Sequence, residues 1–530
     1  MCTSYEYRCR YNGEAGDGLR EVSRSNIGSH TQRRGRPNRS TLSADSDSTR
    51  VLQEREDHGS SSTATGVEFA STMAFPHLLG ISLDAFDLPR PQSFAHNSET
   101  RREGPEQRHP NLRTILTEKQ LQHLSAIYFG TIGPIANIID KDHFARRSQD
   151  YYQSSTDPRS LACAPVVAGV AALGSFLSPA RHPHESEMAQ HAKVVLEDPS
   201  PARRLDTDHV AAWALRVLYL RATTRLDIVW LASCTLMHIC EVVGLHDEKM
   251  IRKIASRDGT TPAQQDEEAE RLRRLFWFSW AGHKVMAYEY DRSAVQIRRT
   301  TCRPAKPVYG TITNQFIELA QIIPQYDLTA IEEDDTIDTS SDLCMRVREL
   351  REFPTAHPFL AVTKADLAFC FYRRLYHLGV CIPASVLDLI VDIGHEGVIA
   401  AAQLAGKGRV FWNVIGSVFH CISVLLAIDT PAAMAHLPVA VGRLEDISKV
   451  AHAHLAREAL SMAKHLLSLK MARKRAELAQ LESIGASAQM TAAGTSVDAA
   501  HADNLDMGLD VDWDQFLVEP YLWMLDSVPR

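Results

Sequence analysis

The chain has 530 residues, 45% of them hydrophobic, which is enough to bury one large core or two ordinary ones, and its formal net charge is -8. Ten cysteines in a chain of this length exclude the dense disulfide framework of a small secreted domain and favour a reducing compartment. Residues 1–11 are polar, unlike a signal peptide, and proline and glycines interrupt the longest apolar stretch, 161–177, so we expect a soluble protein without a membrane-spanning segment.

The two ends of the chain differ in charge. Residues 1–40 contain eight arginines and four acidic residues, whereas residues 485–530 contain eight acidic residues and no basic residue except Arg530. The N-terminal end therefore suits binding to phosphates, and the C-terminal end repels them. Residues 12–110 are rich in Ser, Thr, Arg, Gly and Asp, which predicts a disordered linker, because this composition cannot repay the entropy of ordering.

The most basic part of this linker is residues 33–39, RRGRPNR. The arginines in this stretch that suit contact with DNA phosphates are Arg33, Arg34, Arg36 and Arg39. The stretch also contains the RGRP core of an AT-hook, whose arginines enter the narrow minor groove of A·T tracts. Nuclear import and simple solvation are the alternatives for a basic run this short.

Between residues 111 and 484, apolar residues recur at helical spacing, which predicts one all-α domain or two fused ones. One helical face is expected to be buried and to end at a C-terminal glycine, Gly244. The residues of this face are Leu226, Trp230, Cys234, Met237 and Cys240.

Two further segments have recognisable helical features. Thr261, followed by Gln264, has the pattern of a capping box, and Pro262 suits the first helical position, so we expect a helix to begin there. Residues 441–481 are expected to form a long amphipathic helix or helix pair with a basic end, which either packs within the chain or dimerises.

The C-terminal residues 485–530 alternate acids with bulky apolar residues, most clearly in residues 509–517, LDVDWDQFL. Such alternation is typical of disordered activation segments, in which charge keeps Trp513, Phe516 and Leu517 in water until a coactivator binds them. The alternative is a tail helix that docks on its own domain.

Residues 1–11 contain Cys2 and Cys9 with six residues between them, and an aromatic residue follows two places later. This pattern resembles the end of the fungal six-cysteine zinc binuclear cluster, in which the cysteines bind zinc. The resemblance implies Cys2 and Cys9 as zinc ligands and the neighbouring Arg8 and Arg10 as DNA-facing residues. Two cysteines cannot close the tetrahedron that zinc prefers, so zinc is expected only in a complete cluster.

The other four cysteines of that pattern are absent from this sequence, as are the basic residues between the second and third of them, which read the DNA in that family. We interpret this as a chain truncated at its N-terminus by a gene model that starts too late. The alternative is a natural regulator without a DNA reader of its own.

A second resemblance lies in the middle of the chain. Its pieces are residues 128–144, residues 218–246, the sequence ERLRRLFW at 270–277, and Asp291-Arg292. In the same order, these are similar to the opening, the central helix pair, the E-x-x-R-R-x-F-W hallmark and the D-R pair of the fungal-specific transcription factor domain, the middle homology region. The resemblance covers about residues 115–430 and implies an all-helical regulatory domain. Cys302-Arg303-Pro304 departs from the family's G-R-P, because it lies later and lacks the glycine.

Two patterns invite a comparison with metal sites. The acidic cluster DDTID at 334–338 resembles the magnesium-binding motif of all-α isoprenoid synthases, but it lies in a polar stretch, 332–342, and a solvated loop is expected. Cys234, His238 and Cys240 have no fourth ligand in view and are expected to be core residues. Neither a nucleophile elbow nor a phosphate-binding loop occurs in the sequence. We therefore expect that the chain is not an enzyme.

The sequence therefore predicts a nuclear, sequence-specific DNA-binding regulator of RNA polymerase II transcription that is zinc-dependent in its complete form. The expected parts are a cluster remnant at 1–11, a linker at 12–110, an all-helical domain at 111–484 and an acidic tail at 485–530. The expected partners are DNA, a second copy or a relative in a dimer, and coactivators, without a membrane. A regulator that lacks a DNA reader and acts by heterodimerisation is the first alternative, and an all-α isoprenoid-diphosphate enzyme is a remote one.

Overall fold

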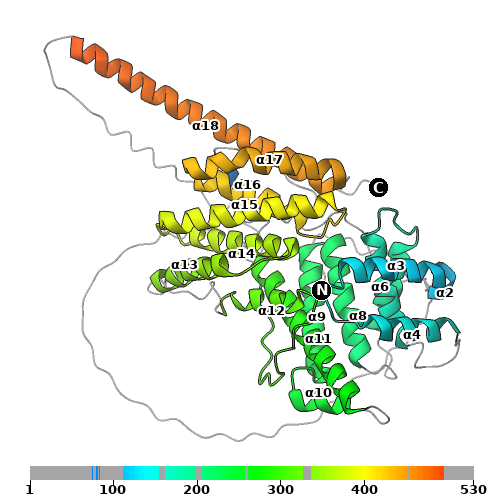
Figure 1. Ribbon diagram of the computed structural model, residues 1–530. Coiled ribbons are helices and arrows are strands. Elements are labelled where there is room, and N and C mark those ends of the chain that lie inside the picture. The colour runs from blue at the N-terminus through cyan, green and yellow to red at the C-terminus, as the bar shows by residue number, and fades with distance from the viewer. Residues whose placement is uncertain are drawn as a thin grey trace, which may run out of the picture. The chain divides into compact units, whose positions relative to one another are not determined.

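The computed structural model describes Phe75, Leu79, Gly80, Leu83 and residues 111–153, 162–198, 205–256, 261–325, 336–451 and 453–493. Within these residues the regular structure is helical and no strand occurs, which confirms the predicted all-α fold class (Figure 1).

The first group of helices surrounds the apolar helix α6. These helices are α2 (Leu112–Ile115), α3 (Glu118–Thr131), α4 (Lys141–Gln153), α6 (Ala164–Phe176), α7 (Glu185–Glu197) and α8 (Thr207–Thr223). Every residue of α6 is buried, and the helix packs against α3, α7 and α8. Gly174 allows the closest of these approaches, because a Cβ atom there would lie 2.1 Å from the carbonyl oxygen of Leu124 on α3.

The next group comprises α9 (Leu226–Val243), α10 (Glu248–Ala255), α11 (Pro262–Glu289) and α12 (Thr313–Gln321). The predicted ends are confirmed: Gly244 ends α9 with a positive φ of 86°, and Thr261 and Gln264 form a capping box with Pro262 at the start of α11. Both signals are local, since the residues that form each of them lie within one helical turn.

The buried face of α9 is rotated relative to the predicted one. Met237 and Cys240 are fully buried, but Leu226, Trp230 and Cys234 are only half-buried. The deeper side of the helix also includes Val229, Ala232, Ser233 and Leu236. Helical spacing identifies residues that share a face, but the neighbouring helices decide which face is covered.

Among the described residues, α9 is the one helix that is long and apolar enough to cross a membrane by length and composition. The 18-residue window that passes this test is 39% buried against the rest of the chain. Core helices can pass the same test, so this finding is weak evidence for a membrane segment.

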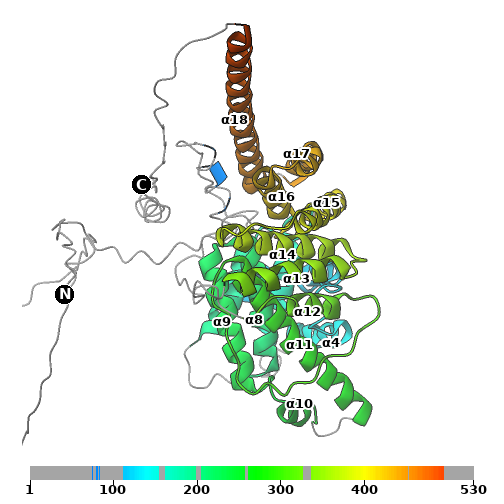
Figure 2. The same cartoon turned by 90° about the vertical axis from the view of Figure 1, so that its left-hand side faces the viewer.

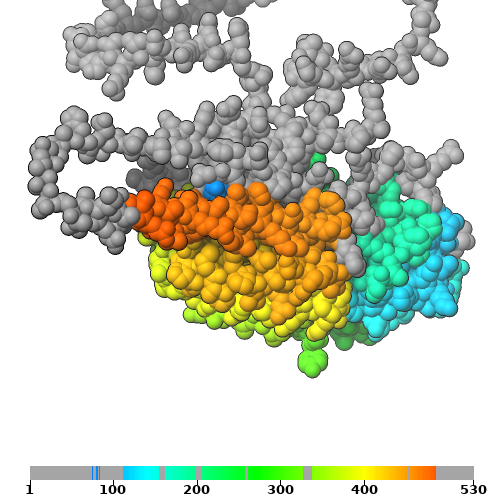
Figure 3. Space-filling model, turned by 90° about the horizontal axis from the view of Figure 1, so that it is seen from above, coloured from blue at the N-terminus to red at the C-terminus, as the bar shows by residue number. Residues whose placement is uncertain are grey.

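The C-terminal group comprises α13 (Thr336–Glu352), α14 (Pro358–His377), α15 (Ala384–Gly406), α16 (Val414–Ile428), α17 (Pro431–Ala451) and α18 (His454–Ala493). Helices α14 and α15 approach closely at Gly397, where a Cβ atom would lie 2.4 Å from the Cβ of Ala365. Figure 3 shows the face formed by α17 and α18, in orange, and α17 packs on both α15 and α16.

Residues 441–481 form a helix pair, which was one of the two predicted alternatives. Helix α17 ends at Ala451 and α18 begins at His454. Lys470 and Lys474 of α18 both pair with Asp429 at the end of α16, at 2.8 and 2.7 Å. From Met471 to Ile484 nearly every residue is exposed, and the helix runs on past its neighbours (Figure 2). It extends to Ala493, so the first nine residues of the predicted acidic tail are helical.

Three residues of the predicted linker belong to the core. Phe75, Leu79 and Leu83 are 3%, 4% and 6% exposed. The ring of Phe75 contacts those of Tyr372 and Tyr376 on α14 edge-on, with centroid distances of 6.0 and 5.7 Å. The burial of these three residues was not expected from the prediction of a disordered linker at 12–110. Composition could not reveal it, because their contacts are made with residues far along the chain.

The acidic stretch 332–342 also differs in part from the expected loop. Helix α13 begins at Thr336, so Asp338 and Asp342 are helical, and Asp342 pairs with Arg346 one turn later at 3.3 Å. Asp334 and Asp335 lie outside the described residues.

Candidate functional site

Arg273, from the hallmark at 270–277, joins α10 to α11. Its side chain is 4% exposed, and its Nε donates to Oε2 of Glu248 on α10 at 3.0 Å. Its Nη1 donates to Oε1 of Glu270, one turn earlier on α11, at 2.6 Å. The hydrogen bonds from Arg273 lower the pKa of Glu248 to about 2, so this carboxylate stays ionised in the folded protein.

Other hallmark side chains hold loops against α11. Arg274 Nε donates to the backbone oxygen of Asn137 at 3.2 Å, and Trp277 Nε1 donates to that of Arg303 at 2.9 Å. Phe276 is 1% exposed in the core. Each of these side chains therefore has a structural partner, and the loop around Cys302-Arg303-Pro304 is fixed without the family's glycine.

We expect Arg273→Lys to lower the thermal unfolding midpoint. One ammonium cannot reproduce the forked contacts with Glu248 and Glu270, and a poorly paired buried group costs on the order of 1–3 kcal/mol. The folded pKa of Glu248 lies below its ordinary value of 4.5, so its contribution is present above about pH 4.5 and is lost as the pH falls toward 2. The deficit of the variant, measured by thermal unfolding, should therefore shrink in acid.

Arg443→Lys is the matched control for this substitution. Arg443 forms an ion pair with Asp446 at 3.6 Å on the exposed side of α17, with side chains 47% and 56% exposed. Its replacement should change the stability by less than about 0.5 kcal/mol. Equal deficits in the two variants would contradict the role assigned to Arg273.

The D-R pair connects the end of α11 to α14. Asp291 has a positive φ of 55°, and its Oδ1 accepts a hydrogen bond of 2.7 Å from Arg374, whose side chain is 3% exposed. The Arg374 guanidinium also lies 3.6 Å from the ring centroid of Tyr288. Asp291 of the D-R pair therefore also makes a structural contact.

A layer of buried polar side chains joins α8 and α11 to α14 and α16. Arg221 of α8 and Glu289 of α11 are 5% and 1% exposed and form an ion pair, with Nη2 2.5 Å from Oε2. Asp366 of α14 accepts a hydrogen bond of 3.1 Å from Nδ2 of Asn413, the residue before α16. The first contact joins α8 to α11 and the second joins α14 to the start of α16, and the charges of Glu289 and Arg221 act on Asp366 across the layer.

Burial dominates the electrostatics of this layer. It raises the pKa of Asp366, and the nearby carboxylate of Glu289 raises it further. It also raises the pKa of Glu289, against the opposing effect of Arg221. Four buried atoms in the layer have no hydrogen-bond partner among the described residues, namely Arg221 Nε, Glu289 Oε1, Asp366 Oδ1 and Asn413 Oδ1.

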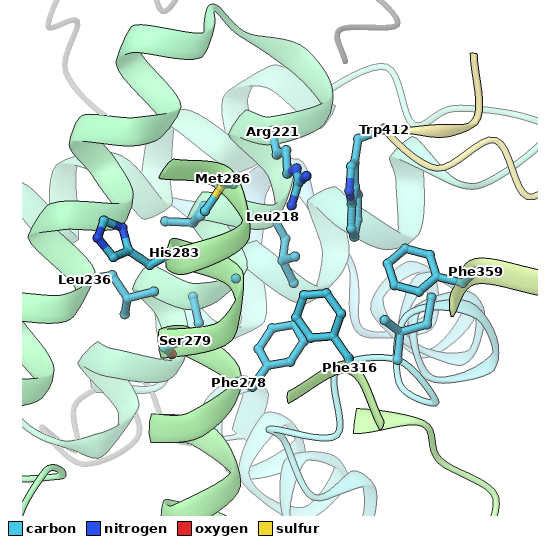
Figure 4. Close-up of a pocket in the computed structure, with 14 residues that line it drawn as sticks. Leu218, Arg221, Leu236, Phe278, Ser279, His283, Met286, Phe316, Phe359 and Trp412 are labelled. Carbon is cyan, nitrogen blue, oxygen red and sulfur yellow. The ribbon is translucent and has the colours of Figure 1, made fainter. Parts of the chain in front are cut away.

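A small cavity of about 30 Å³ borders this layer. Figure 4 shows Arg221 and Trp412 at one end, with the guanidinium 5.4 Å from the ring centroid, and Ser279 and His283 at the other. Apolar side chains such as Phe278 line the space between them. Pockets for small molecules measure roughly 300–1,000 Å³, so in this conformation the cavity is a packing space.

His283 is a structural residue that the sequence analysis did not single out. Its Nε2 accepts a hydrogen bond from the backbone N–H of Val295 at 2.8 Å, so its Nδ1 carries the proton and donates to Ser233 Oγ at 2.8 Å. Burial lowers the pKa of His283 to about 4, so the ring is neutral at physiological pH. Its partners lie 12 and 50 residues away in sequence, outside the helical turn that a local pattern covers, and for this reason no local pattern could identify it.

The structure brings together no metal site from the predicted candidates. No group of three or more His, Cys, Asp or Glu side chains among the described residues is placed to hold a metal ion. Cys240 is fully buried, as expected of a core residue, and burial raises its pKa to about 12. The expectation is wrong for His238, whose side chain is 63% exposed and lies near Glu241, with Nδ1 3.6 Å from Oε2, because it faces away from the neighbouring helices.

The predicted zinc, DNA-binding and activation residues lie outside the described residues and stay predictions. These are Cys2, Cys9, Arg8, Arg10, Arg33, Arg34, Arg36, Arg39, Trp513, Phe516 and Leu517.

Comparison with known proteins places the chain in a protein family. Residues 126–294, from α3 to just beyond α11, match the model of the fungal specific transcription factor domain. The chain is 35% identical to Protein RDR1 of Saccharomyces cerevisiae over 448 residues, which is 84% of this chain and 78% of that protein. It is 30% identical to Transcription factor kojR of Aspergillus oryzae over 417 residues, which is 78% of this chain and 73% of that protein.

No solved structure matches the chain significantly. The matched range includes Arg273 with its partners Glu248 and Glu270. It also includes Arg221 and Glu289 of the buried layer. The chain therefore belongs to the fungal transcription factors that carry the fungal specific transcription factor domain.

Proposed function

We propose that this chain is a nuclear, sequence-specific DNA-binding regulator of RNA polymerase II genes, dependent on zinc in its complete form. The observation that carries the proposal is the similarity to the proteins named transcription factor kojR over 78% of the chain. It agrees with the basic character of residues 1–40, which suits phosphates, and with the order of parts along the chain.

In this proposal each part of the chain has its own task. Arg8 and Arg10 beside the cysteines and the basic residues 33–39 contact DNA, while Trp513, Phe516 and Leu517 recruit coactivators. The helical domain has a regulatory task, and its hallmark side chains are engaged in structural contacts. Cys2 and Cys9 supply two thiolate ligands, fewer than the four that a closed zinc site needs.

Chromatin immunoprecipitation of the protein tagged at its own gene in the host, so that any upstream cysteines are expressed with it, tests the proposal. We expect enrichment at a discrete set of promoters that share a short sequence. Cys9→Ser, or replacement of Arg33, Arg34, Arg36 and Arg39 by Ser, should strongly reduce this enrichment, because each change removes part of the proposed DNA-facing end. Cys381→Ser, at an exposed cysteine in the helical domain, is the control and should leave the enrichment unchanged.

The second candidate is a regulator that reaches DNA through an intact relative. It is favoured by exposed apolar residues on α18, where Met471, Leu478 and Leu481 are 45%, 57% and 67% exposed. Promoter enrichment that survives the Cys9 and arginine changes but is lost on deletion of a relative would select this candidate. Sequencing the 5′ end of the transcript for in-frame cysteine codons upstream of Met1 separates the two independently.

A further inference from the structure

Two histidines meet across helices α15 and α17. Nδ1 of His395 on α15 lies 3.2 Å from Nδ1 of His436 on α17, and the ring centroids are 4.5 Å apart. The residues are 41 positions apart in sequence, and the packing of the two helices brings them together. Both are half-buried, so solvent and small ions can reach the rings.

The distance between the two nitrogens suits a shared metal ion. Imidazole nitrogens bind zinc at about 2.0–2.1 Å, so two of them in a tetrahedral site lie about 3.4 Å apart. A separation of 3.2 Å is close to this value and is reached without moving either helix. It also fits a single N–H···N hydrogen bond between two neutral rings, and an experiment must therefore distinguish the two.

Small side chains flank His436 on its own helix. On α17, the residues one turn before and after His436 are Ala432 and Ala440, whose small side chains cannot reach over its ring. On α15, Asp392 is exposed one turn before His395, and its negative charge acts on Arg351 of α13 as well as favouring a cation. The neighbouring Glu396 pairs with Arg351 of α13, so its charge is already compensated.

We propose that His395 and His436 form a clamp for one divalent transition-metal ion of the zinc, nickel or copper class. Imidazole suits these metals, whereas magnesium and calcium prefer oxygen ligands. Because no third protein ligand is in place among the described residues, water completes the coordination and binding is reversible.

A bound ion would cross-link α15 and α17 and stabilise the folded chain by mass action. Helix α17 leads directly into α18, which packs on it, so the ion would also strengthen the support of α18. The clamp is independent of the proposed function, because it uses none of the residues assigned to DNA or coactivators. The proposal also predicts that the purified chain binds a metal ion at a site other than Cys2 and Cys9.

The test uses the full chain without an affinity tag, with Cys2→Ser and Cys9→Ser, stripped of metal by a chelator. Calorimetric titration and thermal unfolding are recorded with zinc, nickel, copper or magnesium. We expect one bound ion per chain and a raised unfolding midpoint with zinc, nickel and copper, strongest with copper and absent with magnesium. His395→Ala and His436→Ala should each abolish both effects.

His465→Ala on α18 is the matched control, because it removes another half-buried histidine far along the chain and should retain metal binding. Circular dichroism of each variant without metal checks that the helices are kept. No metal binding by the parent chain, or equal binding by the His395 and His436 variants, would overturn the proposal and leave a hydrogen-bonded neutral histidine pair.

Discussion

Arg221→Met should lower the free energy of unfolding by about 3–5 kcal/mol, one of the largest effects expected of a single change in this chain. The substitution removes the hydrogen-bonded counterion of Glu289, which is 1% exposed, and leaves only the charge of Arg373 to oppose the cost of its burial. The cost arises from the buried charge left behind rather than from the loss of the pair itself, because a buried ion pair gains little over apolar residues. Chemical or thermal unfolding of the full chain measures the loss.

The double variant Arg221→Met with Glu289→Leu distinguishes this cause from simple loss of packing. Removing both charges should recover most of the stability, since well-packed apolar residues can replace a buried ion pair at little cost. A double variant as unstable as Arg221→Met would show that the electrostatic explanation is wrong.

The deficit of Arg221→Met should also depend on pH. Burial already raises the pKa of Glu289, and loss of Arg221 removes the main effect that opposes the rise. A carboxyl group whose folded pKa is raised destabilises the fold increasingly as the pH rises above the unfolded value. The difference in unfolding free energy between the variant and the parent chain should therefore be smaller at about pH 5 than at about pH 8. At about pH 8 the buried Glu289 must either ionise or keep a proton that it would lose in the unfolded chain, and both cost free energy.

Gly174→Ala should also destabilise the fold, by about 1–3 kcal/mol or more, because the added methyl group has no room. Its Cβ atom would lie 2.1 Å from the carbonyl oxygen of Leu124 and 2.8 Å from the carbonyl carbon. These are backbone atoms of α3, so no side chain can move aside, and α3 and α6 must separate. Thermal unfolding monitored by circular dichroism measures this loss.

Gly442→Ala is the control with the opposite expected sign. Gly442 lies inside α17, and a Cβ atom there would meet nothing within 4 Å. Alanine should therefore stabilise the chain by about 0.5–1 kcal/mol through its higher helix propensity. If both substitutions destabilised the chain equally, the tight contact between α3 and α6 would not be the reason.

By itself, the sequence determined the features that depend on residues within one or two helical turns. The all-α class follows from apolar spacing, the start of α11 from Thr261 and Gln264, and the end of α9 from Gly244. The family hallmark at 270–277 was also evident, since it is a contiguous string of residues. The sequence did not show that these residues hold α10 and two loops against α11, because their partners lie in other segments.

Only the tertiary structure decided which residues meet over long distances in sequence. It buried Phe75 against Tyr372, paired Arg221 with Glu289 and placed His395 beside His436. No local pattern encodes such contacts, because they depend on how whole helices pack and on which face each helix turns inward. The predicted DNA-binding and activation residues rest on composition and resemblance, which describe charge and motif but not the packing that creates a site.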